Sequence, residues 1–271
     1  MPADAPARWP ARLRLQATGA TSVHAAHEGP LRLLKTLHPE GQQIAHAVVV
    51  HPPGGLVGGD RLTIEIDVAT GAHLLVTTPA ATRFYRSAQL EAVQDVQAHV
   101  AGRLEWLPQE TLAYRGCRAR NQLKVSLQGQ LLASELLALG LPEAGEPFDH
   151  GEVLQHLEID GLWLDRAWIR AQDAALMQGP CGLAGARVLG TLLLAQAGPL
   201  EGSEALLQAA REQLQASGLQ GGATLLHGRL LLLRVLAADL EPATALLRAV
   251  RGRWRRLAWG VPEHEPRIWG T

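Results

Sequence analysis

The sequence is poor in cysteine and in aromatic residues. It holds two cysteines, Cys117 and Cys181, in 271 residues, and aromatic residues make up 4% of the chain. Two cysteines so far apart form neither a disulfide framework nor a Cys-x-x-Cys metal site. A reducing compartment suits such a chain, so we expect a cytoplasmic protein.

The sequence also lacks an excess of charge and any long apolar run. The formal net charge is −1, which argues against a nucleic-acid partner. The longest apolar runs, such as Leu230–Leu233, are far shorter than the roughly 20 residues that span a bilayer, so no membrane association is expected. The N-terminal residues are rich in proline and alanine and lack the apolar core of a signal peptide.

Signature motifs of common enzymes are missing as well. The chain has no Gly-x-x-x-x-Gly-Lys-[Ser/Thr] phosphate-binding loop and no Gly-x-Ser-x-Gly nucleophile motif. Eleven histidines are present, but no pair has His-x-x-x-His spacing within an expected helix. We therefore expect no tightly held His/Cys metal site.

A strand pattern recurs through the middle of the chain. Four segments each consist of an alternating strand, a short turn and another strand, with the turn glycines at Gly71, Gly102, Gly129 and Gly161. This pattern is typical of β-hairpins, and its regular recurrence predicts stacked rungs. The fold class expected is mostly β, a helically wound stack of hairpins or β-helix-like sheets. A plain β-sandwich predicts similar turns and stays open as an alternative.

The composition changes in the C-terminal third, where we expect two α-helices. Ser203–Gly218 and Pro242–Gly260 have helical apolar periodicity and end at glycine, and an apolar strand over 229–237 lies between them. We expect one domain over 1–271, with a loose tail (1–11), a β-rich body (12–198) and an α/β portion (199–271). The second helix carries an arginine-rich face, which is expected to be solvated: Arg248, Arg251, Arg253, Arg255 and Arg256.

A glycine-rich loop follows the apolar run at 48–50. Two prolines end that run, and four glycines come next: Gly54, Gly55, Gly58 and Gly59. These glycines permit positive φ angles and close backbone approach, so the loop is expected to be structural. A strand follows it, whereas phosphate-binding loops lead into a helix. The tight turn therefore places the carboxylate of Asp60 at the end of the loop.

Four sequence words resemble one known family. HPPGGLVGGDRL, TTPAATRFYRS (77–87), LEWLPQETLAY (104–114) and the closing PRIWGT (266–271) are similar to words of the urease accessory protein D family (UreD, also called UreH). The resemblance runs from about residue 13 to the end of the chain. It implies a mostly β, helically wound fold with a few helices.

The resemblance also implies a function. Members of the family are urease maturation factors that are not enzymes. This chain would bind apo-urease and accessory protein F, and through F the accessory GTPase protein G. Together they would route nickel into the urease active site. The resemblance further implies that the protein holds no tightly bound cofactor and binds Ni²⁺ only transiently.

Four residues match the family's proposed nickel path: Asp60, Thr82, Glu135 and Asp165. Carboxylates in such apolar segments need a partner or water. One interpretation pairs them with Arg61, Arg83 or Arg166; the other places them along an internal aqueous passage. Oxygen ligands in small number suit weak nickel contacts. Leu141 occupies a position where the family usually has arginine, which alters the charge balance expected there.

The C-terminal segment is the expected partner surface, through Trp254, Leu257, Ile268 and Trp269. An alternative is that the tail closes the core. Glu105 and Glu110 flank the word WLP, and we interpret them as a strand end and a turn, with Trp106 packing in the core.

Two other functions remain as alternatives. One is a metal-dependent hydrolase on a β scaffold that uses Asp60 and nearby histidines, which would retain stoichiometric metal through desalting. The other is a β scaffold module that handles no metal, for which the carboxylates would be dispensable.

Overall fold

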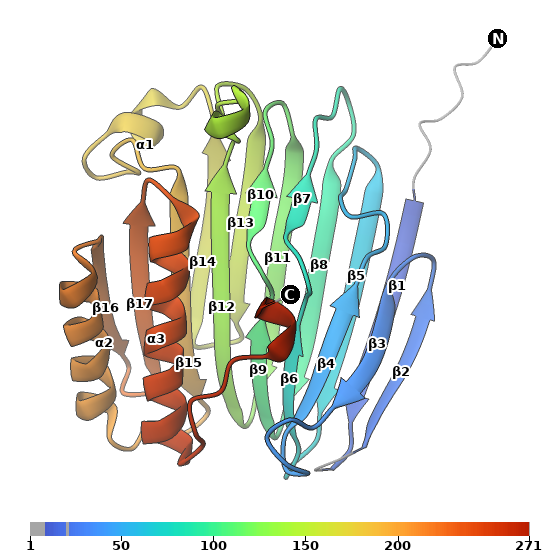
Figure 1. Ribbon diagram of the computed structural model, residues 1–271, viewed down its shortest axis with the longest axis vertical. Coiled ribbons are helices and arrows are strands. Elements are labelled where there is room, and N and C mark those ends of the chain that lie inside the picture. Colours follow the sequence, from blue (N-terminus) through green and yellow to red (C-terminus); the bar gives the residue numbers. More distant parts are fainter. Residues whose placement is uncertain (1–8, 20–21, 271) are drawn as a thin grey trace.

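Two β-sheets form most of the molecule (Figure 1). The computed structural model describes residues 9–19 and 22–270. Sheet A has the strand order β14-β13-β11-β8-β5-β1-β2. Its strands are β1 (Trp9–Ala17), β2 (Val23–Glu28), β5 (Asp60–Val68), β8 (Ala92–Val100), β11 (Arg118–Leu127), β13 (Glu152–Ile159) and β14 (Trp163–Arg170).

Sheet B has the order β16-β17-β15-β12-β9-β6-β4-β3, and the short strands β7 and β10 extend it beside β12. Its strands are β3 (Arg32–Leu37), β4 (Ala45–Val50), β6 (His73–Thr77), β7 (Thr82–Phe84), β9 (Arg103–Leu107), β10 (Thr111–Ala113), β12 (Gln130–Leu139), β15 (Val188–Gln196), β16 (Gln220–Leu226) and β17 (Leu230–Ala237). The helices are α1 (Ala174–Gln178), α2 (Ser203–Ser217) and α3 (Leu240–Trp259), with 3₁₀ turns η1 (Pro142–Ala144) and η2 (Arg267–Gly270).

The chain winds between the two sheets, and the predicted mostly β, helically wound class is confirmed. Successive turns add a strand to sheet A and one to sheet B, so β5, β8 and β11 are parallel neighbours, as are β6, β9 and β12. The turns at Gly71, Gly102 and Gly129 therefore connect the two sheets and are not hairpins. The turn at Gly161 does close a hairpin, between antiparallel β13 and β14.

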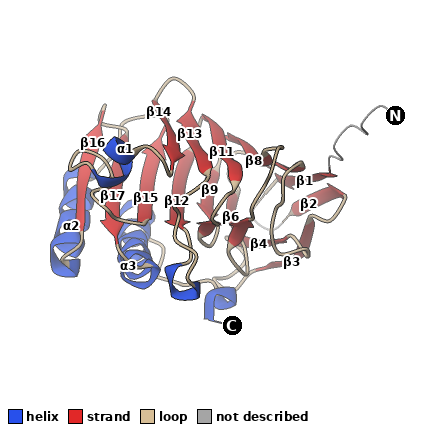
Figure 2. Cartoon of the chain, turned by 90° about the horizontal axis from the view of Figure 1, so that it is seen from above, coloured by secondary structure: helices blue, strands red, loops and turns tan. Residues whose placement is uncertain are grey.

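The core lies in two layers. Alternate residues of both sheets, such as Leu15, Ile66 and Leu104, meet between the sheets. The opposite face of sheet B is covered by α2 and α3, which lie on that side alone (Figure 2). Sheet A instead turns its outer face to solvent with exposed ion pairs such as Arg14–Asp67. Among the described residues, no helix is both long and apolar enough to cross a membrane.

Element boundaries differ from the sequence predictions in a few places. β1 begins at Trp9, inside the stretch 1–11 expected to be a loose tail; residues 1–8 lie outside the described part. The two C-terminal helices and the strand between them are confirmed, although α3 begins two residues before Pro242. β16 was not predicted, because Gly221 and Gly222 weaken its strand pattern.

The arginine face of α3 is only partly solvated, which corrects one prediction. Arg251 and Arg255 are 2% and 0% exposed and reach the outer face of sheet B. Glu105, 0% exposed on β9, accepts hydrogen bonds from Arg251 Nη2 (2.9 Å) and Arg255 Nε (3.0 Å). Glu105 is thus the charged anchor of α3 and not simply a strand end.

Two histidine–glutamate pairs complete this buried charge cluster. Arg255 also contacts Glu40 at 2.8 Å, and Glu40 lies 2.8 Å from His46 Nε2. His73 Nε2 is 2.9 Å from Glu105. Burial alone would raise the pKa of Glu105, but Arg251, His73 and Arg255 hold it well below its usual range. Burial lowers the pKa of His73, so its neutral ring donates to Glu105. The cluster therefore joins three parts of the chain: the loop between β3 and β4, which carries Glu40, sheet B, and α3.

A first prediction concerns the stacked turns. A Cβ at Gly129 would lie 1.9 Å from the carbonyl oxygen of Gly102, so Gly129→Ala forces backbone apart. We expect a loss of about 1–3 kcal/mol in unfolding free energy, measured by denaturant titration. Gly198→Ala is the matched control, because its Cβ meets only Gln196 Nε2, at 4.0 Å. Equal stability of the two variants would contradict this view of the turns.

A second prediction concerns Glu105. Glu105→Gln removes the negative charge that compensates two buried arginines, so it should lower the unfolding free energy by about 3–5 kcal/mol. Glu65→Gln, on the exposed face of sheet A, should lower it by less than about 1 kcal/mol. The folded-state pKa of Glu105 is depressed, so its contribution is complete above the ordinary carboxyl pKa and is lost as the pH falls toward the folded-state value. Unfolding titrations between pH 7 and pH 3 should therefore show a shallower acid dependence in the variant. Similar costs for both variants would contradict the anchoring role.

Candidate functional site

The glycine loop is built by close contacts as well as by positive φ angles. Gly54 and Gly59 have φ of +79° and +98°. A Cβ at Gly55 would lie 2.2 Å from the Tyr85 ring, and one at Gly58 would lie 2.0 Å from Ser87 Oγ. The Asp60 carboxylate accepts a hydrogen bond from the Val57 amide at 2.9 Å. Positive φ angles and close contacts thus account for all four glycines, and Asp60 closes its own loop.

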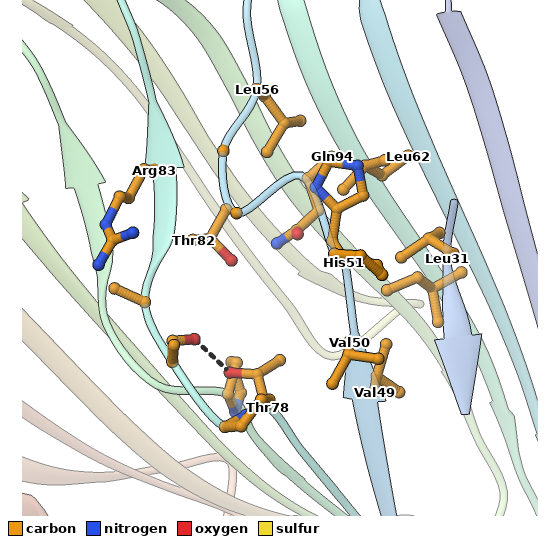
Figure 3. Close-up of a pocket in the computed structure, with 18 of the residues that line it drawn as sticks. Leu31, Val49, Val50, His51, Leu56, Leu62, Thr78, Thr82, Arg83 and Gln94 are labelled. Atoms are coloured by element: carbon orange, nitrogen blue, oxygen red, sulfur yellow. Dashed lines mark hydrogen bonds between the residues drawn. The ribbon is translucent and has the colours of Figure 1, made fainter. Parts of the chain in front are cut away.

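A cavity of about 300 Å³ lies beneath this loop (Figure 3). Its polar lining includes His51 at the start of the loop, Thr82 on β7 and Gln94 on β8. The side chains of His51, Thr82 and Gln94 lie around the same space (Figure 3). Burial lowers the pKa of His51, and the nearby charge of Asp60 partly opposes that shift. His51 is therefore a neutral ring at neutral pH, able to accept a proton or a cation.

A row of amides leads from this cavity through the interior. Gln94, Asn121 and Gln155 occupy the same register position on the parallel strands β8, β11 and β13. Each replaces an apolar residue of the inward face, and Gln94 Nε2 donates to Asn121 Oδ1 at 3.0 Å. Sequence analysis missed this amide ladder, although aligning the recurring strand units would have shown an amide at one position in three of them.

Glu135, on sheet B, contacts the amide ladder, which lies on sheet A. It lies on β12, and its Oε2 accepts hydrogen bonds from Asn121 Nδ2 (3.0 Å) and Gln155 Nε2 (2.7 Å). Burial raises the pKa of Glu135 to about 7, because these hydrogen bonds only partly offset the loss of water. Trp106 Nε1 adds a further donor directed at Glu135, which also works to lower its pKa. Gln155 Oε1 is buried here without a hydrogen-bond partner among the described residues. The site therefore keeps one amide oxygen free to accept a further contact.

A second cavity, of about 490 Å³, opens on the other side of Glu135. Its lining includes Glu135, Gln155, Asp165 and Arg234. Asp165 on β14 forms an ion pair with Arg234 on β17, across the two sheets. The predicted arginine partnership is thus right in kind for Asp165, but its partner is none of Arg61, Arg83 and Arg166.

Three of the four predicted path residues border the two cavities, and we call these three residues together with the amide ladder the line. Thr82 borders the first cavity, Glu135 lies between the cavities and Asp165 borders the second. Asp60 lines neither cavity and acts on the first through the charge it exerts on His51. Leu141 takes part in a backbone bridge with Glu146 at the start of η1, away from this line.

The described residues give no support to a catalytic metal site. Over residues 9–19 and 22–270, no group of three histidine, cysteine, aspartate or glutamate side chains is arranged to hold a metal ion. Asp60 has His51 as a neighbour, which alone does not make the metal site that the alternative hydrolase would need. The carboxylate and amide oxygens of the line suit contacts that a divalent cation makes and leaves quickly.

The expected partner residues divide into buried and exposed ones. Trp254 is 0% exposed and donates from Nε1 to the Leu206 carbonyl at 2.9 Å, so its expected partner contact is wrong. Trp269 donates to Thr77 Oγ1 at 2.8 Å and lies 4.6 Å from the Arg248 guanidinium. Ile268 is half-buried beside it in η2, and the tail therefore covers sheet B; Thr271 lies outside the described residues. Leu257, 50% exposed, does remain available to a partner.

Comparisons with known proteins agree with the sequence words quoted above. The model of the UreD urease accessory protein family matches residues 8–270. The urease accessory protein UreD of Leptothrix cholodnii is 49% identical over 93% of this chain and 93% of its own length. Those of Paracidovorax citrulli and Variovorax paradoxus are 49% and 45% identical, over 96% and 97% of this chain and 99% of their own lengths. The chain belongs to the UreD urease accessory protein family.

Proposed function

We propose that this protein is a non-enzymatic scaffold of urease maturation that binds apo-urease and offers nickel a route through its own interior. One observation carries the proposal: the amide ladder and Glu135 connect the cavity under the glycine loop with the cavity at Asp165. A fold that needed only a stable core would place apolar residues at these inward positions, as it does elsewhere in the same strands.

The chemistry of the line suits a cation in transit. Amide oxygens and a single carboxylate replace part of the water around a divalent cation without the thiolates or imidazole clusters that would trap nickel. Glu135 is the strongest ligand of the line, and its elevated pKa leaves it partly protonated near pH 7 when the line is empty. A buried carboxylate that is half neutral costs less to maintain than a permanent charge. The empty route is therefore compatible with a stable fold.

The partners of the proposed function are apo-urease, accessory protein F and, through F, the GTPase protein G. The sequence supports this division of labour, because the chain has no phosphate-binding loop and any nucleotide hydrolysis must come from another protein. Nickel is the cargo in this scheme and not a resident cofactor. The two cavities would face the two sides of the complex between which nickel passes.

A third prediction tests the route at Glu135. Glu135→Gln keeps the size of the side chain and one oxygen but removes the charge. We expect complexes with urease and with F and G to form in normal yield, while nickel per urease active site falls by about tenfold or more. Co-expression, affinity isolation and metal analysis measure both quantities. Glu158→Gln, which removes a carboxylate from the exposed face of β13, is the matched control.

Two results would overturn the route. One is full nickel loading by the Glu135→Gln protein. The other is loss of the complexes themselves, which would show that Glu135 serves the fold or a partner contact. Asn121→Leu interrupts the amide ladder without touching a charge and should reproduce the loading defect. Asp60→Ala is a less direct test, because Asp60 also holds the glycine loop closed.

A further inference from the structure

Sheet B extends further than sheet A at the C-terminal end of the winding. Sheet A ends at β14, whereas sheet B continues past β15 to β17 and β16 (Figure 2). Among the described residues, sheet A therefore supplies no strand that could face the last strands of sheet B. The second cavity, of about 490 Å³, lies here, and residues of β15, β16 and β17 contribute to its lining.

One row on the inner face of sheet B leads from Glu135 toward this edge. Thr191 on β15 lies opposite Glu135, and Arg234 on β17 lies opposite Thr191. The next position, on β16, is Gly222, where a Cβ would meet no atom within 4 Å. All four residues line the second cavity. The row therefore runs from the buried carboxylate to open space, with one guanidinium on the way.

Arg234 is held by two side chains of β14. Its Nη2 donates to Asp165 Oδ2, and its guanidinium carbon lies 5.6 Å from the centre of the Trp163 ring. Asp165 and Trp163 are two residues apart, so they share one face of the strand. The side chains of Arg234 and Asp165 are 47% and 34% exposed. Water therefore reaches this ion pair, and ion pairs of that kind contribute little net stability.

Two carboxylates line the second cavity, and they differ in their partners. Glu135 is held by the neutral amides of Asn121 and Gln155. Asp165 is paired with the positive charge of Arg234. A divalent cation that binds Asp165 must therefore compete with a guanidinium, whereas one that binds Glu135 meets no such competitor in the pair of amides.

We propose that Arg234 is the counter-cation of the nickel route: it holds Asp165 while the second cavity is empty and gives way to a divalent cation that arrives from Glu135. The inference rests on the proposed function for the identity of the cation. The positive charge of Arg234 lowers the affinity of Asp165 for nickel, because the two cations repel each other. The face of Trp163 and the space beside Gly222 receive the displaced guanidinium. Asp165 is thus a ligand that nickel can both reach and leave.

The test is direct nickel binding by the full-length protein. Equilibrium dialysis against nickel chloride, followed by metal analysis, measures the affinity. Arg234→Gln removes the competing charge, so the affinity for Ni²⁺ should rise by about tenfold or more. Arg234→Lys keeps a positive charge and should bind nickel as the wild type does. Arg234→Gln combined with Asp165→Asn should lose the gain, because the released carboxylate is absent.

Arg187→Gln is the matched control. Arg187 pairs with Asp239, whose side chain is 67% exposed, and neither residue lines the second cavity. Releasing that carboxylate should leave the nickel affinity unchanged. Arg234→Met, which keeps an apolar stem without the charge, is measured beside Arg234→Gln, and the melting temperatures identify a folding defect in either. Loss of the fold in both would show that the ion pair is structural and would overturn the proposal.

The outcomes separate this inference from the nickel route. Wild-type nickel affinity in the folded Arg234→Gln and Arg234→Met proteins would overturn the counter-cation role. A gain that persists without Asp165, or that Arg187→Gln shows equally, would overturn it too. None of these results would affect the loading defect expected of Glu135→Gln. Conversely, full nickel loading by Glu135→Gln, together with an Asp165-dependent gain in Arg234→Gln, would reject the route and keep the competition at Asp165.

Discussion

The parallel, in-register stacking of strands is the constraint on which the rest of this structure depends. Because each turn of the winding repeats the position of the one before, a residue type that recurs in the sequence becomes a row in space. Amides at one inward position form the ladder, and Glu135 bridges two of them. Tyrosines after β7 and β10 stack in the same way. Glycines at the turns stack so closely that a Cβ at Gly129 would lie 1.9 Å from a carbonyl oxygen. The amide ladder, the tyrosine pair and the stacked turns are three results of one register.

The fold buries polar groups in two different ways, and only one of them leaves room for a guest. On the outer face of sheet B, Glu105 accepts from Arg251, Arg255 and His73, so both of its oxygens are occupied. That cluster compensates its charges internally and fastens α3 to the sheet, as a buried ion pair must if it is not to destabilise the fold. Between the sheets, Glu135 is held by neutral amides, and Gln155 Oε1 has no partner among the described residues. The paired charges hold the protein together, whereas the amide oxygen of Gln155 is left without a partner and is the atom that the proposed route would use.

The fold class followed from the sequence because alternation and regular glycine spacing are local properties. What the strands pair with is not local, and for that reason the turns at Gly71, Gly102 and Gly129 were misinterpreted as hairpins. The same limit explains the arginines of α3: helical periodicity showed a charged face, but the partner of Arg255 is 150 residues away in the sequence at Glu105. Glu135 and Asp165 became candidates as carboxylates in apolar segments, and the family resemblance, which carries positional information that composition lacks, supported them and added Thr82. The amide ladder was within reach of the sequence, since it required only aligning the strand units with one another.

The spacing of the amide ladder bears on how the proposed nickel route would work. Neighbouring strands are about 4.8 Å apart, so Gln94, Asn121 and Gln155 present polar atoms at roughly equal steps across the sheet. In the proposed route, a cation moving along such a row would exchange one weak ligand for the next and would never leave all of them at once. Conduction requires sites that are favourable enough to enter and weak enough to leave. A single deep site of histidines and thiolates satisfies the first condition and fails the second. The proposed route relies on a row of neutral amides with one carboxylate of elevated pKa, which would satisfy both conditions, and this row arises directly from the register of the strands.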